Sequence, residues 1–296
     1  MKQISLLLAL IILLLSLCSC AAPETQAQVA ATTLPVYEFT SRICEGTGIS
    51  VTRLVTESVS CLHDYSLNVS QVRAAEAAEL IVISGAGMED FMEDLLADKA
   101  VVDCSVGIDL IEATHDHSHE QEVHEHEGHQ HEEDPHIWLS PENAKIMAGN
   151  ICSGLSIRYP EHADAFRQNL DVLLGELDAL QAYGEEQLSQ LKCRELITFH
   201  DGFAYLARSF DLTILEAVEE ESGSEASAAE LKHLIEEVRH HDLPAIFTEA
   251  LGSVSAAQII AAETGTNVYT LDMAMHGEGY FSAMYHNIST LKGALG

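Results

Sequence analysis

Residues 80–104 read LIVISGAGMEDFMEDLLADKAVVDC, and this stretch decides the fold class. Residues 80–84 form a continuous apolar run with the length of a buried strand, and Gly85-Ala86-Gly87 ends it. Residues 88–98 predict an amphipathic helix, and residues 100–104 predict a second strand. Buried strands that are joined by helices pair in parallel, so the sequence predicts an α/β layer fold.

The same alternation covers the rest of the chain. Two helices are predicted at residues 141–159 and 160–192, and the second has apolar residues at three- and four-residue spacing. Earlier in the chain, strands are predicted at 31–36 and 49–55 and a helix at 69–79. Later, strands are predicted at 195–199, 212–215, 245–248 and 267–271, and helices at 202–210, 227–241, 254–264 and 280–295.

These elements fall into two groups. We expect two lobes, residues 31–158 and 193–296, each with a mostly parallel sheet flanked by helices. Residues 159–192 are expected to be one long helix that joins the lobes and runs along both of them.

The first 20 residues are typical of an export signal. Residues 4–17 are an apolar run that is shorter than the roughly 20 residues a membrane span needs. A small residue precedes Cys20, as in the bacterial lipoprotein cleavage box, which predicts that Cys20 is lipidated and begins the mature chain. The alternative is an ordinary signal peptide that is cut near Ala22. Residues 21–30 are expected to be a flexible tether.

The charge balance excludes one class of partner. The formal net charge is −33, whereas nucleic-acid binding depends on lysine and arginine that neutralise phosphates. An acidic surface is compatible with the attraction of cations. Five cysteines remain after residue 20, so at least one thiol is free whatever the disulfide pairing, which the sequence leaves open: Cys44, Cys61, Cys104, Cys152 and Cys193.

Residues 112–134 are rich in histidine and acid and have too few apolar side chains to form a core. Imidazole at this density is typical of a segment that collects borderline metal ions, zinc above all. We therefore expect a solvated auxiliary metal loop, with these candidate ligands: His115, His117, His119, His124, His126, His129 and His131.

Four more candidate ligands lie where a predicted strand or ordered segment ends. They are His63, His136, His200 and Asp272. Ligands of open α/β sheets gather beyond the carboxyl ends of the strands, so two ligands from each lobe would place an ion in the cleft between the lobes. Three imidazoles and one carboxylate make a good four-coordinate zinc shell, and manganese is the alternative ion.

Several segments resemble the cluster A-I solute-binding proteins of bacterial ABC transporters for zinc and manganese. They occur in the family's order: HDY at 63–65, GAGME at 85–89, DPHIWLSP at 134–141, FHDGFAYLA at 199–207, IFTEA at 246–250 and MYHNISTLKGAL at 284–295. The resemblance implies two α/β lobes bridged by one long helix. It also implies that His63, His136, His200 and Asp272 bind the metal ion, and that the histidine loop marks the zinc-specific branch.

The chain departs from the family pattern beside two ligands. Leu62 stands where the family has proline, Ser66-Leu67 where it has Glu-Pro, and Met273 follows Asp272 in place of proline. These changes make the fourth ligand less defined than the three histidines, and water or another carboxylate could replace Asp272. Glu249 ends a strand and is expected to hydrogen-bond a ligand imidazole, although a plain surface carboxylate is the alternative.

The sequence therefore predicts an extracytoplasmic zinc receptor that is anchored by lipid to the outer face of the cytoplasmic membrane, or is periplasmic. It would deliver Zn²⁺ to the permease and ATPase of an ABC importer, and we expect it to be a monomer. A zinc hydrolase is disfavoured because no HExxH motif or obvious general base occurs, so we expect no enzymatic activity. A manganese (Mn²⁺) receptor and a metal-binding surface adhesin are the two competing functions.

Overall fold

The computed structural model describes residues 27–59, 62, 65–112, 133–218 and 226–296. Its first sheet has four parallel strands in the order β2-β1-β3-β4. The strands are β1 (Val29–Ala31), β2 (Val51–Arg53), β3 (Leu80–Ile83) and β4 (Val101–Asp103).

The second sheet repeats this topology. Its four parallel strands lie in the order β6-β5-β7-β8, so both sheets place the second strand of the half outside the first. In sheets of this order, ligands bind at the carboxyl ends of the first and third strands, where the chain turns to opposite sides of the sheet. We refer to this place as the crevice. The strands are β5 (Glu195–Phe199), β6 (Thr213–Ala217), β7 (Ala245–Glu249) and β8 (Asn267–Leu271).

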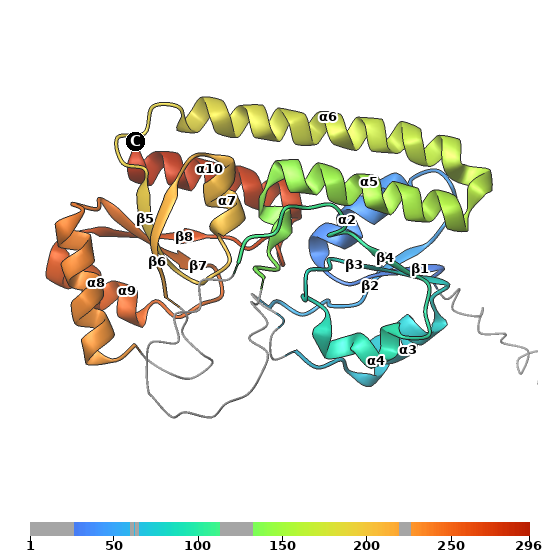
Figure 1. Ribbon diagram of the computed structural model, residues 1–296, viewed down its shortest axis with the longest axis horizontal. Helices are drawn as coiled ribbons and strands as arrows, with labels where there is room; N and C mark the ends of the chain where they lie inside the picture. The colour runs from blue at the N-terminus through green and yellow to red at the C-terminus, as the bar shows by residue number, and fades with distance from the viewer. Residues whose placement is uncertain (1–26, 60–61, 63–64, 113–132, 219–225) are drawn as a thin grey trace, which may run out of the picture.

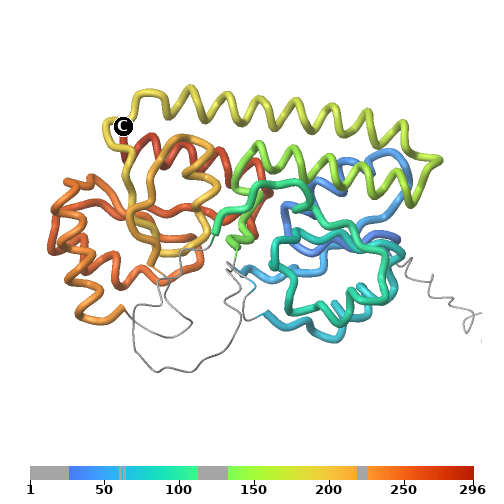
Figure 2. The backbone as a smooth tube through the Cα atoms, viewed as in Figure 1, coloured from blue at the N-terminus to red at the C-terminus, as the bar shows by residue number. Residues whose placement is uncertain are grey.

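One layer of helices lies over both sheets. The 26-residue helix α6 (Ala163–Leu188) runs above both halves of the molecule in Figure 1 and is about 39 Å long at 1.5 Å per residue. It packs against α2 (Leu34–Ile43), α5 (Pro141–Arg158) and α10 (Tyr280–Leu295). In Figure 2 this helix carries the chain from the side of the first sheet over to the second.

The other face of each sheet is covered by helices from the same half of the molecule. In the first half these are α3 (Val69–Ala77), the 3-10 turn η1 (Asp90–Met92) and α4 (Glu93–Leu96). In the second half they are α8 (Ala228–His240) and α9 (Ser255–Thr264), while α7 (Ala204–Ser209) follows β5. Parallel sheets are covered on both faces, and this arrangement satisfies that requirement.

The shared layer and the two sheets enclose a single hydrophobic core. The cluster includes Val29 and Phe39 from the first half and Phe247 and Leu271 from the second, all fully buried. At the junction of the halves, the rings of Phe39 and Tyr280 meet edge to face with centroids 4.9 Å apart. The halves are therefore joined by packing as well as by the chain.

Local signals explain where several helices begin. The Asn68 side chain accepts hydrogen bonds from the backbone N–H groups of Ser70 and Gln71, and the Gln71 side chain accepts the N–H of Asn68. This is a capping box at the start of α3. Ser140 caps α5, whose first residue is Pro141. Ser227 and Glu230 form a second capping box at the start of α8.

The predicted fold class is confirmed, and three elements depart most from the prediction. The strand predicted at 31–36 is wrong beyond residue 31, because α2 begins at Leu34 with Pro35 in its first turn, where a missing N–H is tolerated. The helix predicted at 88–98 is only η1 and the four-residue α4. The helix predicted at 160–192 is shorter, since residues 160–162 form the 3-10 turn η3 and α6 ends at Leu188.

No helix in the described parts of the chain is both long enough and apolar enough to cross a bilayer. The predicted signal segment, Cys20 and the tether up to residue 26 lie outside the described residues.

Candidate metal site

The crevice of the second sheet presents two candidate side chains. His200 follows β5, and Glu249 is the last residue of β7, the strand beside it. The His200 side chain is 12 % exposed and that of Glu249 only 5 %. The parallel order of the strands therefore brings together two residues that are 49 positions apart in the sequence.

His136 lies beside His200 but comes from the segment before α5. It precedes the 3-10 turn η2 (Ile137–Leu139), which lies between α5 and α7. The indole Nε1 of Trp138 donates to the carbonyl oxygen of Met273 at 2.7 Å, so η2 is tied to the segment that follows β8. The single tryptophan thus fixes the position of the neighbouring histidine.

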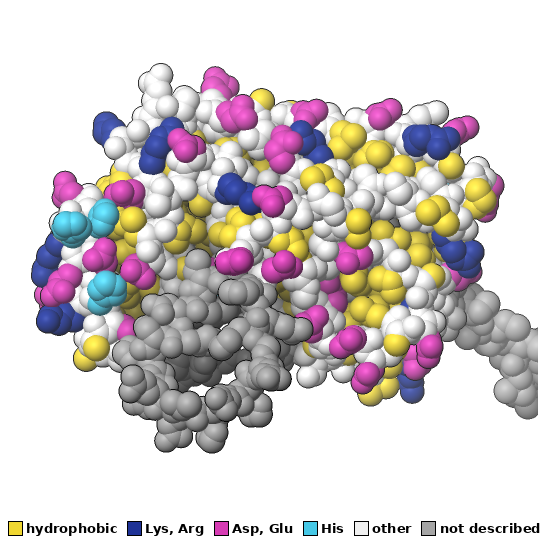
Figure 3. Space-filling view, viewed as in Figure 1, with side chains coloured by type: hydrophobic (Ala, Val, Ile, Leu, Met, Phe, Trp, Pro, Cys, Tyr) yellow, Lys and Arg dark blue, Asp and Glu magenta, His cyan; other side chains and the backbone are white. Residues whose placement is uncertain are grey.

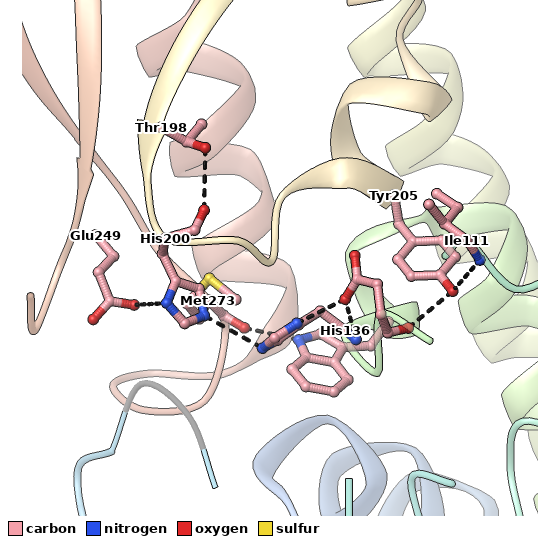
Figure 4. Close-up of polar contacts among 9 residues, drawn as sticks. Ile111, His136, Thr198, His200, Tyr205, Glu249 and Met273 are labelled. Carbon is pink, nitrogen blue, oxygen red and sulfur yellow. Dashed lines mark hydrogen bonds and ion pairs between the residues drawn. The ribbon is translucent and has the colours of Figure 1, made fainter. Parts of the chain in front are cut away.

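Two imidazoles face each other at this crevice. The Nε2 atoms of His136 and His200 are 3.4 Å apart, and the rings are inclined at 84° (Figure 4). Two nitrogens at about 2.05 Å from one tetrahedral zinc ion lie about 3.3 Å from each other. The observed separation is therefore the one that a shared ion requires.

A carboxylate lies behind each imidazole. The Nδ1 atom and the backbone N–H of His136 both bond to Oδ1 of Asp134, at 2.8 and 2.9 Å. On the other ring, Oε2 of Glu249 is 3.8 Å from Nδ1 of His200. Both carboxylates are buried, and within the described chain Oδ2 of Asp134 and Oε2 of Glu249 have no hydrogen-bond donor. With Nδ1 turned to a carboxylate, each ring presents Nε2 to the crevice.

Gly202 allows the two rings to approach. A Cβ atom at this position would lie 2.6 Å from Cε of Met273, 2.8 Å from Cδ2 of His200 and 2.9 Å from Nδ1 of His136. Real Cβ atoms do not come this close to other atoms, so only glycine fits between the rings and the methionine.

Asp272 is held in a turn next to the crevice. Its backbone exchanges two hydrogen bonds of 2.7 Å with the side chain of Asn287, and its Oδ1 accepts the N–H of Ala274 at 2.7 Å. The same oxygen is 3.8 Å from Nε2 of His276. In the parts of the chain that the structure describes, no three His, Cys, Asp or Glu side chains form a metal-binding group.

His63 and the auxiliary histidines 115–131 lie outside the described residues, as does Cys61. Residues on either side of His63 are joined by a polar cluster, in which Tyr65 donates to Glu57 at 2.6 Å and Gln71 donates to both. The hydrogen bond from Tyr65 lowers the pKa of Glu57, which favours its carboxylate form.

The described cysteines are free thiols: Cys44, Cys104, Cys152 and Cys193. Burial raises the pKa of Cys44 to about 12 and holds that of Cys104 well above its usual value. Buried thiols with a raised pKa are inert packing groups rather than metal ligands.

Sequence reasoning missed Asp134, Gly202 and Met273. Asp134 had a usable signal, because it stands two residues before a candidate ligand in Asp-Pro-His, where a carboxylate can fold back onto the ring. Gly202 and Met273 had none, since the contact between them joins segments 71 residues apart.

Residues 29–294 match the model of the family described as zinc-uptake complex component A, periplasmic (ZnuA). The zinc-binding lipoprotein AdcA of Streptococcus pneumoniae is 32 % identical over 99 % of the chain, which spans 61 % of that relative. The high-affinity zinc uptake system protein ZnuA of Bacillus subtilis is 29 % identical, with 90 % of the chain and 87 % of that protein covered.

Solved structures agree with the family match. A crystal structure of ZnuA superposes with a TM-score of 0.77 at 28 % identity and covers 91 % of this chain and all of that one. The Zn(II)-bound ZnuA-like domain of Streptococcus pneumoniae AdcA superposes with a TM-score of 0.75 at 26 % identity, with 90 % and 98 % of the two chains covered.

Proposed function

Because the chain belongs to the ZnuA family of zinc-uptake components, we propose that it is an extracytoplasmic receptor that binds Zn²⁺ and delivers it to an ABC-type importer. One observation carries the proposal. The Nε2 atoms of His136 and His200 face each other at 3.4 Å, the separation that two ligands of one tetrahedral zinc ion have.

The proposed shell has four ligands, His63, His136, His200 and Asp272. Asp272 is kept as the fourth because it follows β8, which pairs with β7 so that Leu271 lies opposite Glu249. Its carboxylate is therefore near the crevice, and it would have to give up its contact with Ala274 or use its second oxygen. Imidazole-rich shells suit zinc, and a manganese receptor is the rival, since Mn²⁺ favours oxygen ligands.

Asp134 and Glu249 are proposed to orient the two ligand rings. A carboxylate on Nδ1 fixes the tautomer that leaves Nε2 free to bind metal and raises its basicity. The 2.8 Å contact of Asp134 with His136 is stronger than the 3.8 Å approach of Glu249 to His200. We expect Asp134 to contribute more to zinc affinity.

The histidine segment at 115–131 is proposed to be an auxiliary collector of metal ions. The residues that flank it are paired, because Glu112 and Glu133 form an antiparallel bridge.

Acidic side chains are also spread over the described surface. Figure 3 shows aspartate and glutamate spread over this face with lysine and arginine among them, which favours cations without forming one dedicated patch.

The remaining proposals concern the setting of the receptor. The two lobes at 31–158 and 193–296, joined through residues 159–192, would hold the ion between them. Cys20 is the proposed lipid anchor, the permease and ATPase of the importer are the proposed partners, and the receptor is a monomer. It catalyses no reaction, because a shell of four protein ligands leaves no open position for a substrate.

The test is zinc titration followed by native mass spectrometry. Wild type should retain one tightly bound ion that His136→Ala loses, whereas His162→Ala, at the start of α6, keeps it. Preference for Mn²⁺ over Zn²⁺ at equal concentrations would make the protein a manganese receptor. Retention of the tight ion by His136→Ala would refute the site.

A further inference from the structure

The hydroxyl of Tyr205 holds both ends of the acidic histidine segment. It accepts a hydrogen bond from the backbone N–H of Ile111 and donates one to the carbonyl oxygen of Asp134, both 3.0 Å long (Figure 4). Asp134 in turn donates its N–H to the carbonyl of Ile111 at 2.8 Å. Three groups from three parts of the chain thus form one closed set of hydrogen bonds.

The same helix makes a second contact with the first of these ends. Arg208, one turn after Tyr205 on α7, donates to the carbonyl oxygen of Asp109 at 2.9 Å. Its guanidinium lies over the Tyr205 ring, 5.1 Å from the centroid. Helix α7 therefore fixes residues 109–111 at two points.

This set of bonds leads directly to the imidazole pair. Asp134, whose carbonyl Tyr205 binds, holds His136 through its carboxylate at 2.8 Å. Tyr205 itself stands five residues after His200, with Gly202 between them. The segment 200–205 thus carries the candidate ligand His200 at its first residue. At its last residue, Tyr205 binds Asp134, whose carboxylate holds His136.

The environment of Tyr205 suits a permanent anchor. Its side chain is 0 % exposed, and burial raises its pKa to about 12. The hydroxyl therefore keeps its proton and can donate to the Asp134 carbonyl at every pH at which the protein would work.

We propose that Tyr205 is a positioning residue for the metal site: by bonding Ile111 and Asp134 together, it fixes the carboxylate that orients His136. This rests on the proposed function, because it concerns the same ion. Tyr205 touches no ion itself. Its effect on zinc affinity passes through Asp134.

The test compares Tyr205→Phe with Tyr159→Phe. Tyr159 is also buried and also hydrogen-bonded, to Glu79 at 3.3 Å, but it follows α5, about 27 Å along that helix from the site. Zinc affinity is measured by competition with a chromophoric chelator, alongside the melting temperature of each apo protein. Tyr205→Phe should bind zinc about tenfold more weakly, the lower end of the effect of outer-shell partners. Tyr159→Phe should bind like wild type even where its melting temperature falls.

A double-mutant cycle separates positioning from general stability. In an Asp134→Ala background, Tyr205→Phe should weaken zinc binding less than twofold, because the side chain through which it acts is already gone. Wild-type affinity in Tyr205→Phe, or a full tenfold loss in both backgrounds, would overturn the proposal. Failure of wild type to bind zinc tightly would instead overturn the proposed function.

Amide hydrogen exchange keeps the proposal testable if Tyr205→Phe does not fold. In wild type, the amides of Ile111 and Asp134 belong to the same closed set of bonds. Zinc should therefore slow the exchange of both, while the amide of Tyr159, bonded within α5, stays unchanged. Protection of only one of the two amides, or of neither, contradicts the proposal.

Discussion

Substitution of Gly202 by alanine tests the geometry of the imidazole pair most directly. The added Cβ would lie 2.6 Å from Met273, 2.8 Å from His200 and 2.9 Å from His136. Ordinary contacts begin near 3.4 Å. The methionine methyl must therefore move by about 0.8 Å and the two rings by about 0.5 to 0.6 Å, in directions away from the new methyl group.

The methionine end can rotate, but the rings cannot move without changing the site. A displacement of about 0.5 Å at each ring disturbs the 3.4 Å separation of the Nε2 atoms, whereas metal–ligand distances hold to within about 0.2 Å. We expect Gly202→Ala to bind zinc about 100-fold more weakly, which is about 2.7 kcal/mol. The apo protein should lose roughly 1–3 kcal/mol of stability from overpacking.

The assay is zinc competition with a chelator, with urea unfolding of the apo protein beside it. Gly175→Ala is the matched control, because a Cβ there meets nothing within 4 Å and the position lies inside α6. It should bind zinc like wild type and gain up to about 1 kcal/mol from helix propensity. Unchanged zinc affinity in Gly202→Ala would mean that these two rings do not share the ion.

Four further predictions concern the metal site, the histidine segment and the first half of the molecule. Asp134→Asn, which keeps an oxygen where Oδ1 accepts both bonds from His136, should weaken zinc binding about tenfold in calorimetry, and Asp134→Ala about 100-fold; wild-type affinity in Asp134→Asn would contradict a role of the charge. Deletion of residues 115–131 should lower the number of zinc ions in native mass spectra while one tight ion remains. Zinc affinity should fall steeply from pH 7.5 to pH 5, because protons compete for the imidazoles, and a flat profile would exclude an imidazole shell. Burial raises the pKa of Glu89 to about 7, so its contribution to stability is full below about pH 4.5 and is lost as the pH rises through 7; wild type should lose stability relative to Glu89→Gln over that range in urea unfolding.

The strand–helix alternation could be predicted because its signals are local. An apolar run of four or five residues and the glycines after it specify β3 and its turn without reference to the rest of the chain. The same local signals place His200 and Glu249 at strand ends, and the parallel order then brings them together. The start of α2 was missed because Thr33 and Pro35 favour extended backbone locally, whereas the helix is stabilised by burying Val36, Phe39 and Ile43 against distant helices.

The contacts that complete the site could not be predicted, because they join remote segments. Tyr205 is hydrogen-bonded to Asp134, 71 residues before it, and to Ile111, 94 residues before it. No pattern in the sequence predicts either hydrogen bond. Asp272 was identified as a candidate from its place at a strand end. Its hydrogen bonds with Asn287, fifteen residues later, depend on how α10 packs against β8.

The core that the two sheets share has a mechanical consequence. A hinge that swung the halves apart would pull Phe39 from Tyr280 and expose buried side chains of α5, α6 and α10 to water, at roughly 25 cal/mol for each Å² of apolar surface. In the proposed receptor, the ion would then enter and leave through rearrangement of short segments at the strand ends. The outline of the molecule, as recorded by small-angle scattering, should scarcely differ between its loaded and empty forms.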